Sequence, residues 1–467
     1  MRNFTTYFLV ILSLNFYSCS NNNDDDNYTP LTAEDREQFS GGDATVFNVS
    51  EEAFGFSIAS LNLDEQTDFG VGNSFFRQSW VSAPSSTTAR DGLGPFFNAI
   101  SCSSCHFKDG RGRPPAFDGE LGKGLLLRFS LNGQDANGLA FPDPIYGGQL
   151  QDNSNLGLTP EGEYRIAYQQ ISETLADGTI VTLQKPTYTV TNLGYGSLAN
   201  VNISPRIANQ IIGLGLLEAI PEATILGFAD ENDSNKDGVS GRPNYVHDFA
   251  TNTTQMGRFG WKANQPNVRQ QVAGALSGDM GITSTLFPNE SGPFGVDLTK
   301  IPNGGTPEIS EINLNRMALY AQTLAVPARR NFTDQNVLKG KKTFETIQCT
   351  ACHIPKIQTG NTHSITSLRN QTIRPYTDLL LHDMGEGLSD NATDFKATGS
   401  EWRTQPLWGI GLIQIVNKHT NLLHDGRARN VEEAILWHGG EAQNAKDKYK
   451  KLPKADRDDL LAFINSL

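Results

Sequence analysis

The short pattern Cys-x-x-Cys-His occurs twice in this chain of 467 residues, and it constrains the fold more than any other feature. The residues of the two copies are Cys102, Cys105, His106, Cys349, Cys352 and His353. The chain has only five cysteines. That is too few for a disulfide scaffold of this length, so the four motif cysteines must have another role.

Two thiols at this spacing, followed directly by an imidazole, suit covalent attachment of a haem. The thiols add to the two vinyl groups of the porphyrin, and the His binds the iron. A zinc site built from the four cysteines is the alternative. Zinc would not need a His after each pair, and an exported thiol pair would tend to be oxidised. The sequence therefore predicts two covalently bound c-type haems, one at each motif.

Each motif is followed later in the chain by a segment that predicts a closing helix, and this shared order indicates a duplication. In 311–327 the apolar periodicity places Ile312 and Tyr320 on one buried face, and in 455–467 the corresponding face contains Phe463. Gly and Phe residues at near-helical spacing precede each motif, in GPFFNAI and GKKTFETI, and predict a further helix there. The fold class that follows is mainly α.

The chain divides into two predicted domains, an N-terminal one over 41–330 and a C-terminal one over 331–467. The first is longer because the region from about 124 to 255 is rich in β-branched and aromatic residues. Within it, Asp177-Gly178 is a hairpin signal between two such runs. We therefore expect a partly β insertion in the first domain.

The N-terminal segment predicts export. Residues 1–18 contain a basic residue and a short apolar run, which is typical of a signal peptide. Cys19 follows a loose match to the lipobox of bacterial lipoproteins, so we expect lipidation there; an ordinary signal cleaved nearby is the alternative. Residues 19–40 form an acidic tether that resembles the export signal of surface lipoproteins. We expect a lipid-anchored protein on the outer membrane, facing the periplasm or the cell surface.

The formal net charge of -13 argues against a nucleic acid as partner. It is consistent with docking of a basic donor protein and also with plain solubility. No later stretch of the chain is long and apolar enough to predict a membrane span, so the lipid anchor is the expected membrane contact.

Several stretches resemble, in order, the di-haem oxidoreductase (peroxidase) branch of the bacterial di-haem cytochrome c peroxidase superfamily. They are GPFFNAISCSSCH, GLGLLEAIPE, GRFGWKA, WRTQPLWGIG and LLHDGRARNVEEAILWHGGEA. The resemblance implies two cytochrome c-like domains and reduction of hydrogen peroxide at the first haem. Electrons would come through the second haem from a small donor protein or a quinone-linked donor. Two other functions stay open: an electron-transfer lipoprotein without its own substrate, and an oxygenase or protein-modifying oxidase.

The resemblance also implies a sixth ligand for the second haem iron. Relatives place it fourteen residues after the His of the His-Asp-Gly stretch, and counting from His424 leads to His438. Met384 is the rival, because a thioether downstream of the motif is a common cytochrome ligand. His382 is the third candidate.

For the first haem, relatives place a Trp between the cofactors, a Gln ten residues later and then an acid. This chain has Trp261 and Gln271 at that spacing, and Asp279 two positions early and one methylene shorter than the expected Glu. A carboxylate beside an open haem face can take a proton from bound peroxide and return it to the leaving oxygen. Glu218 and Glu222 are the next acids to consider.

The loop DSNKDGVSGRPN predicts a candidate calcium site. Asp233, Asn235 and Asp237 occupy positions one, three and five, with Gly at six, as in an EF-hand-type loop. The twelfth position holds Asn244 instead of a bidentate Glu, so we expect modest affinity. An acidic turn without a metal is the alternative.

Overall fold

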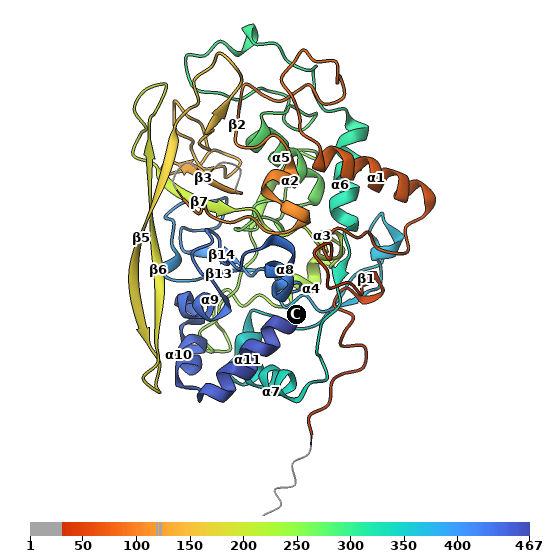
Figure 1. The fold of residues 1–467 in the computed structure, drawn as a ribbon, viewed down its shortest axis with the longest axis vertical. Helices are drawn as coiled ribbons and strands as arrows, with labels where there is room; N and C mark the ends of the chain where they lie inside the picture. The colour runs from red at the N-terminus through yellow and green to blue at the C-terminus, as the bar shows by residue number, and fades with distance from the viewer. Residues whose placement is uncertain (1–29, 118–119, 121–123) are drawn as a thin grey trace, which may run out of the picture.

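The computed structural model describes residues 30–117, 120 and 124–467 (Figure 1). The predicted signal peptide over 1–18 and the predicted lipidation site Cys19 lie outside these residues. Within the described ranges, we find no helix with the length and apolar character needed to cross a membrane.

Short helices and short strands alternate along the described chain. The α-helices are α1 (Leu63–Arg77), α2 (Cys102–Cys105), α3 (Leu214–Glu218), α4 (Glu222–Leu226), α5 (Val268–Met280), α6 (Glu311–Thr323), α7 (Gln335–Thr346), α8 (Ile413–Asn417), α9 (Val431–Trp437), α10 (Gln443–Lys451) and α11 (Lys454–Ser466). The strands are β1 (Thr45–Val46), β2 (Phe96–Phe97), β3 (Leu125–Ser130), β4 (Asn153–Ser154), β5 (Glu163–Thr174), β6 (Ile180–Thr191), β7 (Asn202–Ile207), β8 (Tyr245–Asp248), β9 (Thr253–Met256), β10 (Val326–Pro327), β11 (Ile357–Gln358), β12 (Thr372–Ile373), β13 (Leu381–Asp383) and β14 (Glu401–Arg403).

The prediction of a mainly α fold is wrong. Helices make up 29% of the described residues and strands 18%. The strands form separate two-stranded pairs, and β3 to β9 fall in the region whose composition predicts strands. The helix predicted just before the first motif is also absent, because Phe96 and Phe97 form β2, which pairs with β4. Phe96 packs edge-on against Tyr195, 5.7 Å away, so a distant contact overrides the local helical spacing.

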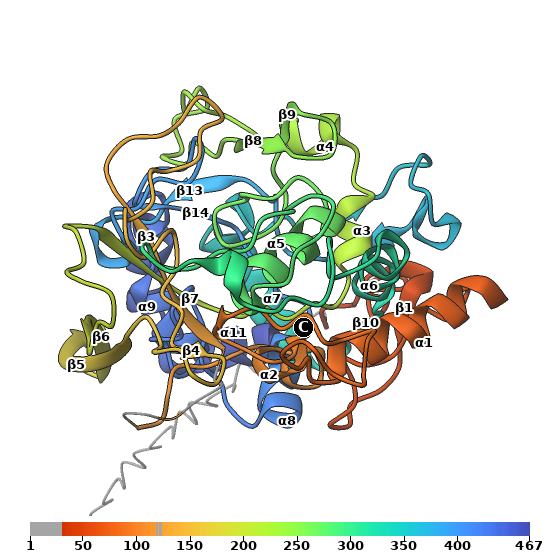
Figure 2. The same ribbon diagram turned by 90° about the horizontal axis from the view of Figure 1, so that it is seen from above.

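The two halves of the chain repeat one close helix crossing. In the first half, α1 crosses α6 at Gly72, where a Cβ atom would lie 2.2 Å from the carbonyl oxygen of Arg316. In the second half, α7 crosses α11 at Gly340, where a Cβ atom would lie 1.9 Å from the carbonyl oxygen of Asp459. Only glycine permits such an approach of two backbones. Figure 2 shows α1 and α6 lying against each other at one side of the body.

A long hairpin from the first half lies along the helices of the second half (Figure 1). β5 and β6 pair in antiparallel register over their whole length. Leu183 is buried in the core formed around α9 and α11. Near the tip, Asp177 makes an ion pair of 2.8 Å with Arg457, and Glu173 makes one of 2.6 Å with Lys450. The hairpin therefore holds the two halves together.

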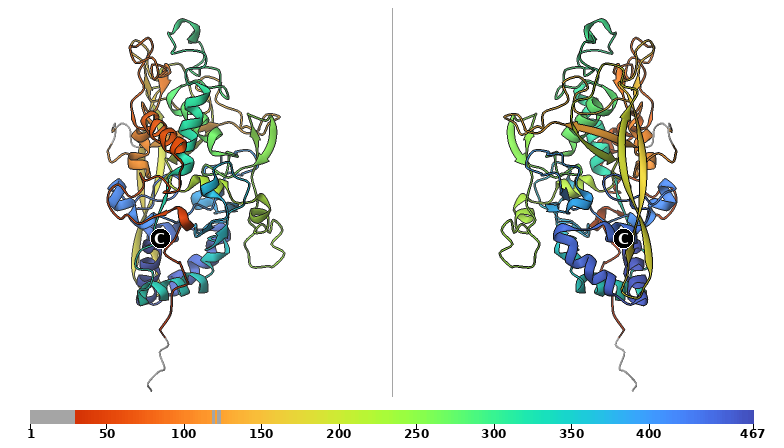
Figure 3. Two further views of the ribbon diagram at one scale, coloured as in Figure 1. Left: turned by 90° about the vertical axis from the view of Figure 1, so that its right-hand side faces the viewer. Right: turned by 90° about the vertical axis from the view of Figure 1, so that its left-hand side faces the viewer.

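The largest core cluster is shared by both halves. Phe54 and Leu217 of the first half pack in one cluster with Leu368, Trp408 and Val416 of the second, and all five are almost completely buried. Around this core, the β8–β9 hairpin stands out on one side of the body (Figure 3). A shared core fixes the two motif-bearing segments at defined positions.

Candidate functional site

Two cavities lie inside the protein, one beside each Cys-x-x-Cys-His motif. Cys102, Cys105 and His106 line the first cavity, and their counterparts in the second motif line the second cavity. All four motif cysteines are free thiols. Among the described residues they form no common metal-binding group, so the alternative of a four-cysteine zinc site has no geometry to support it.

A backbone carbonyl orients each motif histidine. His106 Nδ1 donates to the oxygen of Asn209 over 2.6 Å, and His353 Nδ1 donates to the oxygen of Tyr376 over 2.9 Å. Burial lowers the pKa of both rings, that of His353 to about 4. Both imidazoles are therefore neutral near pH 7, and Nε2 keeps a lone pair for a metal.

The same pair of aromatic rings lies behind each motif histidine. In the first half, Phe76 is 6.0 Å from the ring of His106 and 5.2 Å from that of Tyr320. In the second half, Phe344 is 6.0 Å from the motif histidine and 5.2 Å from Phe463. The rings come from the crossed helices α1 and α6, and α7 and α11, so the repeat extends from the backbone to the side chains around each cavity.

The three residues predicted for peroxide chemistry meet in the wall of the first cavity. Trp261, Gln271 and Asp279 all line it. Gln149 Nε2 donates to Asp279 Oδ1 over 2.9 Å. The Asp279 side chain faces the cavity but is shielded from bulk solvent, and this burial raises its pKa even though Gln149 and Arg128 oppose the shift. The amide oxygen of Gln271 is buried without a hydrogen-bond partner, so it is available to a molecule in the cavity.

The two reserve acids lie elsewhere. Glu218 accepts hydrogen bonds from the backbone nitrogen of Val268 over 2.8 Å and from His363 Nε2 over 3.1 Å. Glu222 is exposed on α4. Neither lines the first cavity. Of the predicted acids, Asp279 is the one that the fold places beside the first motif.

His438 and Met384 both line the second cavity. His438 ends α9, and its Nδ1 donates to the oxygen of Ala434 over 2.6 Å. Burial lowers the pKa of His438, and the charge of His438 in turn helps to lower the pKa of His353. His353 and His438 line one cavity, as the two ligands of one metal would have to, and Met384 lines the same cavity.

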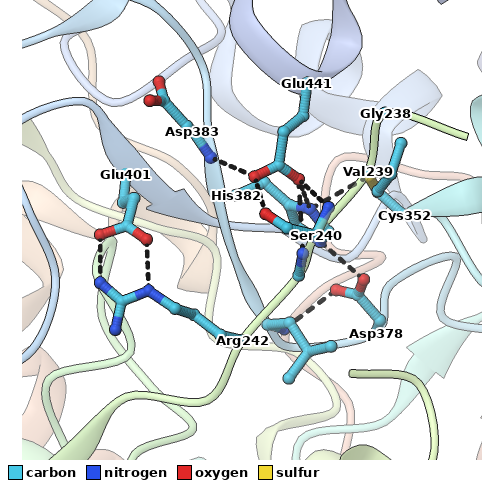
Figure 4. Close-up of polar contacts among 12 residues, drawn as sticks. Gly238, Val239, Ser240, Arg242, Cys352, Asp378, His382, Asp383, Glu401 and Glu441 are labelled. Atoms are coloured by element: carbon cyan, nitrogen blue, oxygen red, sulfur yellow. Dashed lines mark hydrogen bonds and ion pairs between the residues drawn. The ribbon is translucent and has the colours of Figure 1, made fainter. Parts of the chain in front are cut away.

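His382, the third ligand candidate, is fully engaged elsewhere (Figure 4). Its Nε2 bonds to Asp378 over 2.8 Å and its Nδ1 to Glu441 over 2.7 Å. Burial opposes a charge here, but Asp378 holds the pKa of His382 well above its usual range. Both ring nitrogens of His382 are thus occupied by carboxylates, so neither is free for the iron of the second haem; the ligand atoms of Cys352, Asp378 and His382 lie within 4.8 Å of one another.

Glu441 fastens three segments at the edge of the second cavity (Figure 4). Besides the bond to His382, it accepts hydrogen bonds from Ser240 Oγ over 2.6 Å and from the backbone nitrogen of Asp383 over 3.1 Å. Burial disfavours its charge, but the bond from His382 holds the pKa of Glu441 at about 2. The loop before β8, strand β13 and the segment after α9 are thereby held around Cys352.

Trp261 lines both cavities and so lies between them. Its Nε1 donates to the oxygen of Ile207 over 2.8 Å, which fixes the indole plane. His424 lies 6.4 Å from the indole of Trp261 and is stacked on Trp402, a residue of the second cavity. Trp402 stands in the stretch WRTQPLWGIG, but no motif spacing in the sequence singles it out.

Two buried arginines stand between the cavities, and in the described part of the chain the one carboxylate charge felt by either is that of Asp378, which acts on Arg403 from beyond ion-pair distance. Arg111 and Arg403 line both cavities, and among the described residues neither makes an ion pair. Burial lowers the pKa of Arg111 to about 10 and that of Arg403 to about 9. Arg111 Nε and Arg403 Nη1 are buried without hydrogen-bond partners. A buried unpaired guanidinium needs an anion, and the two carboxylates that each haem carries would supply it, so these residues fit the predicted cofactors.

The predicted calcium loop closes on its own backbone. Asp233 accepts a hydrogen bond from the nitrogen of Gly238 over 3.1 Å, and Asp237 accepts one from that of Val239 over 2.9 Å. Asn244 points away and donates to carbonyl oxygens in the protein interior. In the part of the chain that the structure describes, the acids of this loop form no metal-binding group. The calcium site stays a prediction.

The comparison with known families agrees with this geometry. No curated protein matches the chain. The family described as "Di-haem oxidoreductase, putative peroxidase" matches residues 35–467, which include both motifs and both cavities. The two cavities, each with a motif histidine whose Nε2 is free for iron, and the unpaired arginines between them fit two haems. The chain therefore belongs to the di-haem oxidoreductase family.

Proposed function

We propose that this protein is an exported di-haem c-type cytochrome that reduces hydrogen peroxide at the first cavity, with electrons relayed through the second. Each hydrogen peroxide molecule takes up two electrons and two protons and yields two molecules of water. The observation that carries the proposal is the difference between the cavities, which share one motif but differ in the other side chains of their walls.

The first cavity holds groups suited to peroxide. Asp279 and the unpaired amide oxygen of Gln271 face a space in which, among the described residues, His106 is the only histidine. The second cavity has His438 as well as His353. A metal held by two imidazoles suits electron transfer, and a metal with an open position suits a small oxidant. Bound haem would supply an iron for peroxide and for the incoming electrons.

Asp279 is proposed to carry the proton in this reaction. Its carboxylate would take a proton from one oxygen of peroxide and return it to the departing oxygen. Gln149 orients the carboxyl group through the bond to Oδ1. The raised pKa of Asp279, caused by burial, brings the group nearer to neutral pH and so makes it a better proton acceptor than an ordinary carboxylate.

The cysteines of the two motifs are proposed to attach the haems through thioether bonds. The thiols of each motif lie in the wall of one cavity. Burial raises the pKa of Cys102 and Cys105 to about 12, so the free thiols stay protonated at neutral pH. The placement of each thiol pair beside its motif histidine in one cavity supports attachment to a porphyrin.

Export and anchoring belong to the same proposal. The signal peptide over 1–18 and the lipidated Cys19 would place the protein on the outer membrane, where a small donor protein or a quinone-linked donor delivers electrons. The loop of Asp233, Asn235 and Asp237 is a proposed calcium site of modest affinity. Mass spectrometry of the mature N-terminus tests the anchor.

Two measurements on the purified protein test the proposal. Denaturation in alkaline pyridine should leave two haem equivalents bound to each chain, and a colourless zinc protein would end the proposal. Electron paramagnetic resonance of the oxidised protein should show one high-spin and one low-spin haem. Two low-spin haems that stay low-spin after partial reduction would instead favour an electron-transfer protein without its own substrate.

A further inference from the structure

A buried tyrosine and a buried aspartate form a short hydrogen bond behind the first motif. Tyr320 on α6 donates its hydroxyl proton to Asp109 Oδ1 over 2.5 Å. Tyr320 is 1% exposed and Asp109 is 3% exposed. Burial and the neighbouring carboxylate raise the pKa of Tyr320, so the phenol keeps its proton at any ordinary pH. The only way for this phenol to lose an electron easily is to lose its proton to Asp109 at the same time.

The pair lies one layer behind the first cavity. Tyr320 packs in one apolar cluster with Phe76 and with Cys102, the first cysteine of the motif. Phe76 lies between the ring of Tyr320, at 5.2 Å, and the ring of His106, at 6.0 Å. Asp109 follows His106 by three residues in the chain. The phenol thus belongs to the cluster on which Cys102 packs and is one aromatic ring away from His106, but it does not line the cavity where peroxide would bind.

The repeat within the chain shows that helix packing alone does not need this pair. The residue of the second half that corresponds to Tyr320 is Phe463, which contacts Phe344 at the same 5.2 Å. The residue three positions after the second motif histidine is Lys356. The second crossing therefore forms without a hydroxyl group and without a carboxylate. The phenol–carboxylate pair belongs to the half in which we place the reaction with peroxide.

We propose that Tyr320 is a redox-active residue that donates an electron to the first haem site after peroxide has oxidised it, with Asp109 as the acceptor of the phenolic proton. This inference rests on the proposed function. The Tyr320 O–H bond breaks, the proton forms a new O–H bond on Asp109, and the electron reduces the oxidised site by one equivalent. When a donor later returns the electron, the proton moves back from Asp109 to Tyr320. The pair thereby stores one oxidising equivalent inside the protein while no donor is bound.

The test is rapid-freeze electron paramagnetic resonance of the protein carrying both haems, mixed with hydrogen peroxide in the absence of donor. Wild type should develop a radical signal that narrows when the protein contains ring-deuterated tyrosine, and Tyr320→Phe should lose it. This substitution reproduces the packing of the second half, so the fold should persist. Tyr449→Phe is the matched control. Tyr449 is also buried, donates a hydrogen bond of 2.8 Å to Glu432 Oε1 and lines neither cavity.

Asp109→Asn separates a redox role from packing. The amide keeps an oxygen that accepts the hydrogen bond of Tyr320 but is a very poor proton acceptor, so the tyrosyl signal should fall while the haem spectrum stays unchanged. A tyrosyl signal that persists in Tyr320→Phe, or the absence of one in wild type whose haem spectrum responds to peroxide, overturns the inference and leaves the proposed function standing. If peroxide does not change the haem spectrum, the proposed function fails. In that case wild type and the same variants are oxidised with a photo-oxidised ruthenium complex. A tyrosyl signal in wild type that is lost in Tyr320→Phe shows that Tyr320 gives up an electron, and its absence overturns the inference.

Discussion

Trp402 stacks on His424 with ring centroids 3.9 Å apart and planes 10° apart. His424 lies in turn 6.4 Å from Trp261, edge to face. Since Trp402 lines the second cavity and Trp261 lines both, the three rings make a continuous aromatic contact from one cavity to the other. The guanidinium of Arg111 lies 5.1 Å from the centroid of the Trp261 ring. An indole in this position is a natural intermediate for an electron that passes between two haems.

Trp261→Phe should slow electron transfer into the first haem. The phenyl ring keeps much of the apolar packing but is far harder to oxidise than an indole, and it loses the hydrogen bond to Ile207. The rate is measured by stopped-flow absorbance while the protein with one haem reduced reacts with peroxide. Re-reduction of the first haem should slow, whereas the initial reaction should change much less. Trp80→Phe is the control, because Trp80 is buried and lines neither cavity; equal slowing in both variants would remove Trp261 from the route.

Asp279→Asn should lower the rate of peroxide reduction by ~10²- to 10⁴-fold, the usual contribution of general acid-base assistance. Haem content and spectra should stay intact, because the amide has nearly the same shape. In wild type the rate should fall as the pH drops through the pKa of Asp279, since the protonated acid cannot accept a proton. Because burial raises that pKa, this fall should lie above the range of an ordinary aspartate. Glu218→Gln is the matched control outside the cavity, and full activity of Asp279→Asn would show that the acid lies elsewhere.

His438→Ala should change the second haem alone. Loss of one axial imidazole converts a low-spin iron to high-spin or to a weaker ligand set, which electron paramagnetic resonance detects directly. Met384→Ala should leave that signal in place. If only the Met384 variant alters the low-spin signal, Met384 is the ligand and the spacing argument for His438 fails.

Loss of the proton from Glu161 should make the protein less stable as the pH rises. This side chain is 1% exposed, and burial raises its pKa from 4.5 to about 8. Between these two values the folded protein holds a proton that the unfolded chain releases, so the free energy of unfolding should fall by up to ~1.4 kcal/mol per pH unit. Above about pH 8 both states are ionised and this contribution to the slope ends. In urea unfolding, the free energy of unfolding of Glu161→Gln should not fall with pH in this range. If wild type and Glu161→Gln show the same dependence on pH, the pKa of Glu161 is not raised.

The local chemistry of the site could be predicted from the sequence because it depends on short spacings. The two motifs, and the positions of Trp261, Gln271 and Asp279 relative to one another, lie within single stretches of chain, and the fold gathers those three side chains in one cavity wall. The apolar face of α11, with Phe463 fully buried, follows from helical periodicity in the same way.

The contacts between distant segments could not be predicted. Of the two residues expected on the buried face of α6, Tyr320 is buried where α6 crosses α1 at Gly72, whereas Ile312, in the first turn of the helix, is 57% exposed. The pairing of Trp402 with His424, and the placement of Arg111 and Arg403 between the cavities, depend on loops that meet only in the folded protein. The hairpin predicted at Asp177-Gly178 is confirmed as the turn between β5 and β6. The mainly α expectation fails because short strand pairs and long loops between the helices leave no helical periodicity to count.

Reduction of hydrogen peroxide at the first haem is measured by steady-state consumption of a reduced dye, with and without hydrogen peroxide, by the protein that carries both haems. The dye should lose two electrons for each peroxide consumed, and Asp279→Asn should lose this activity while it keeps both haems. A wild-type protein that holds both haems, accepts electrons and yet leaves peroxide untouched in every state of reduction would contradict the proposed reduction at the first haem.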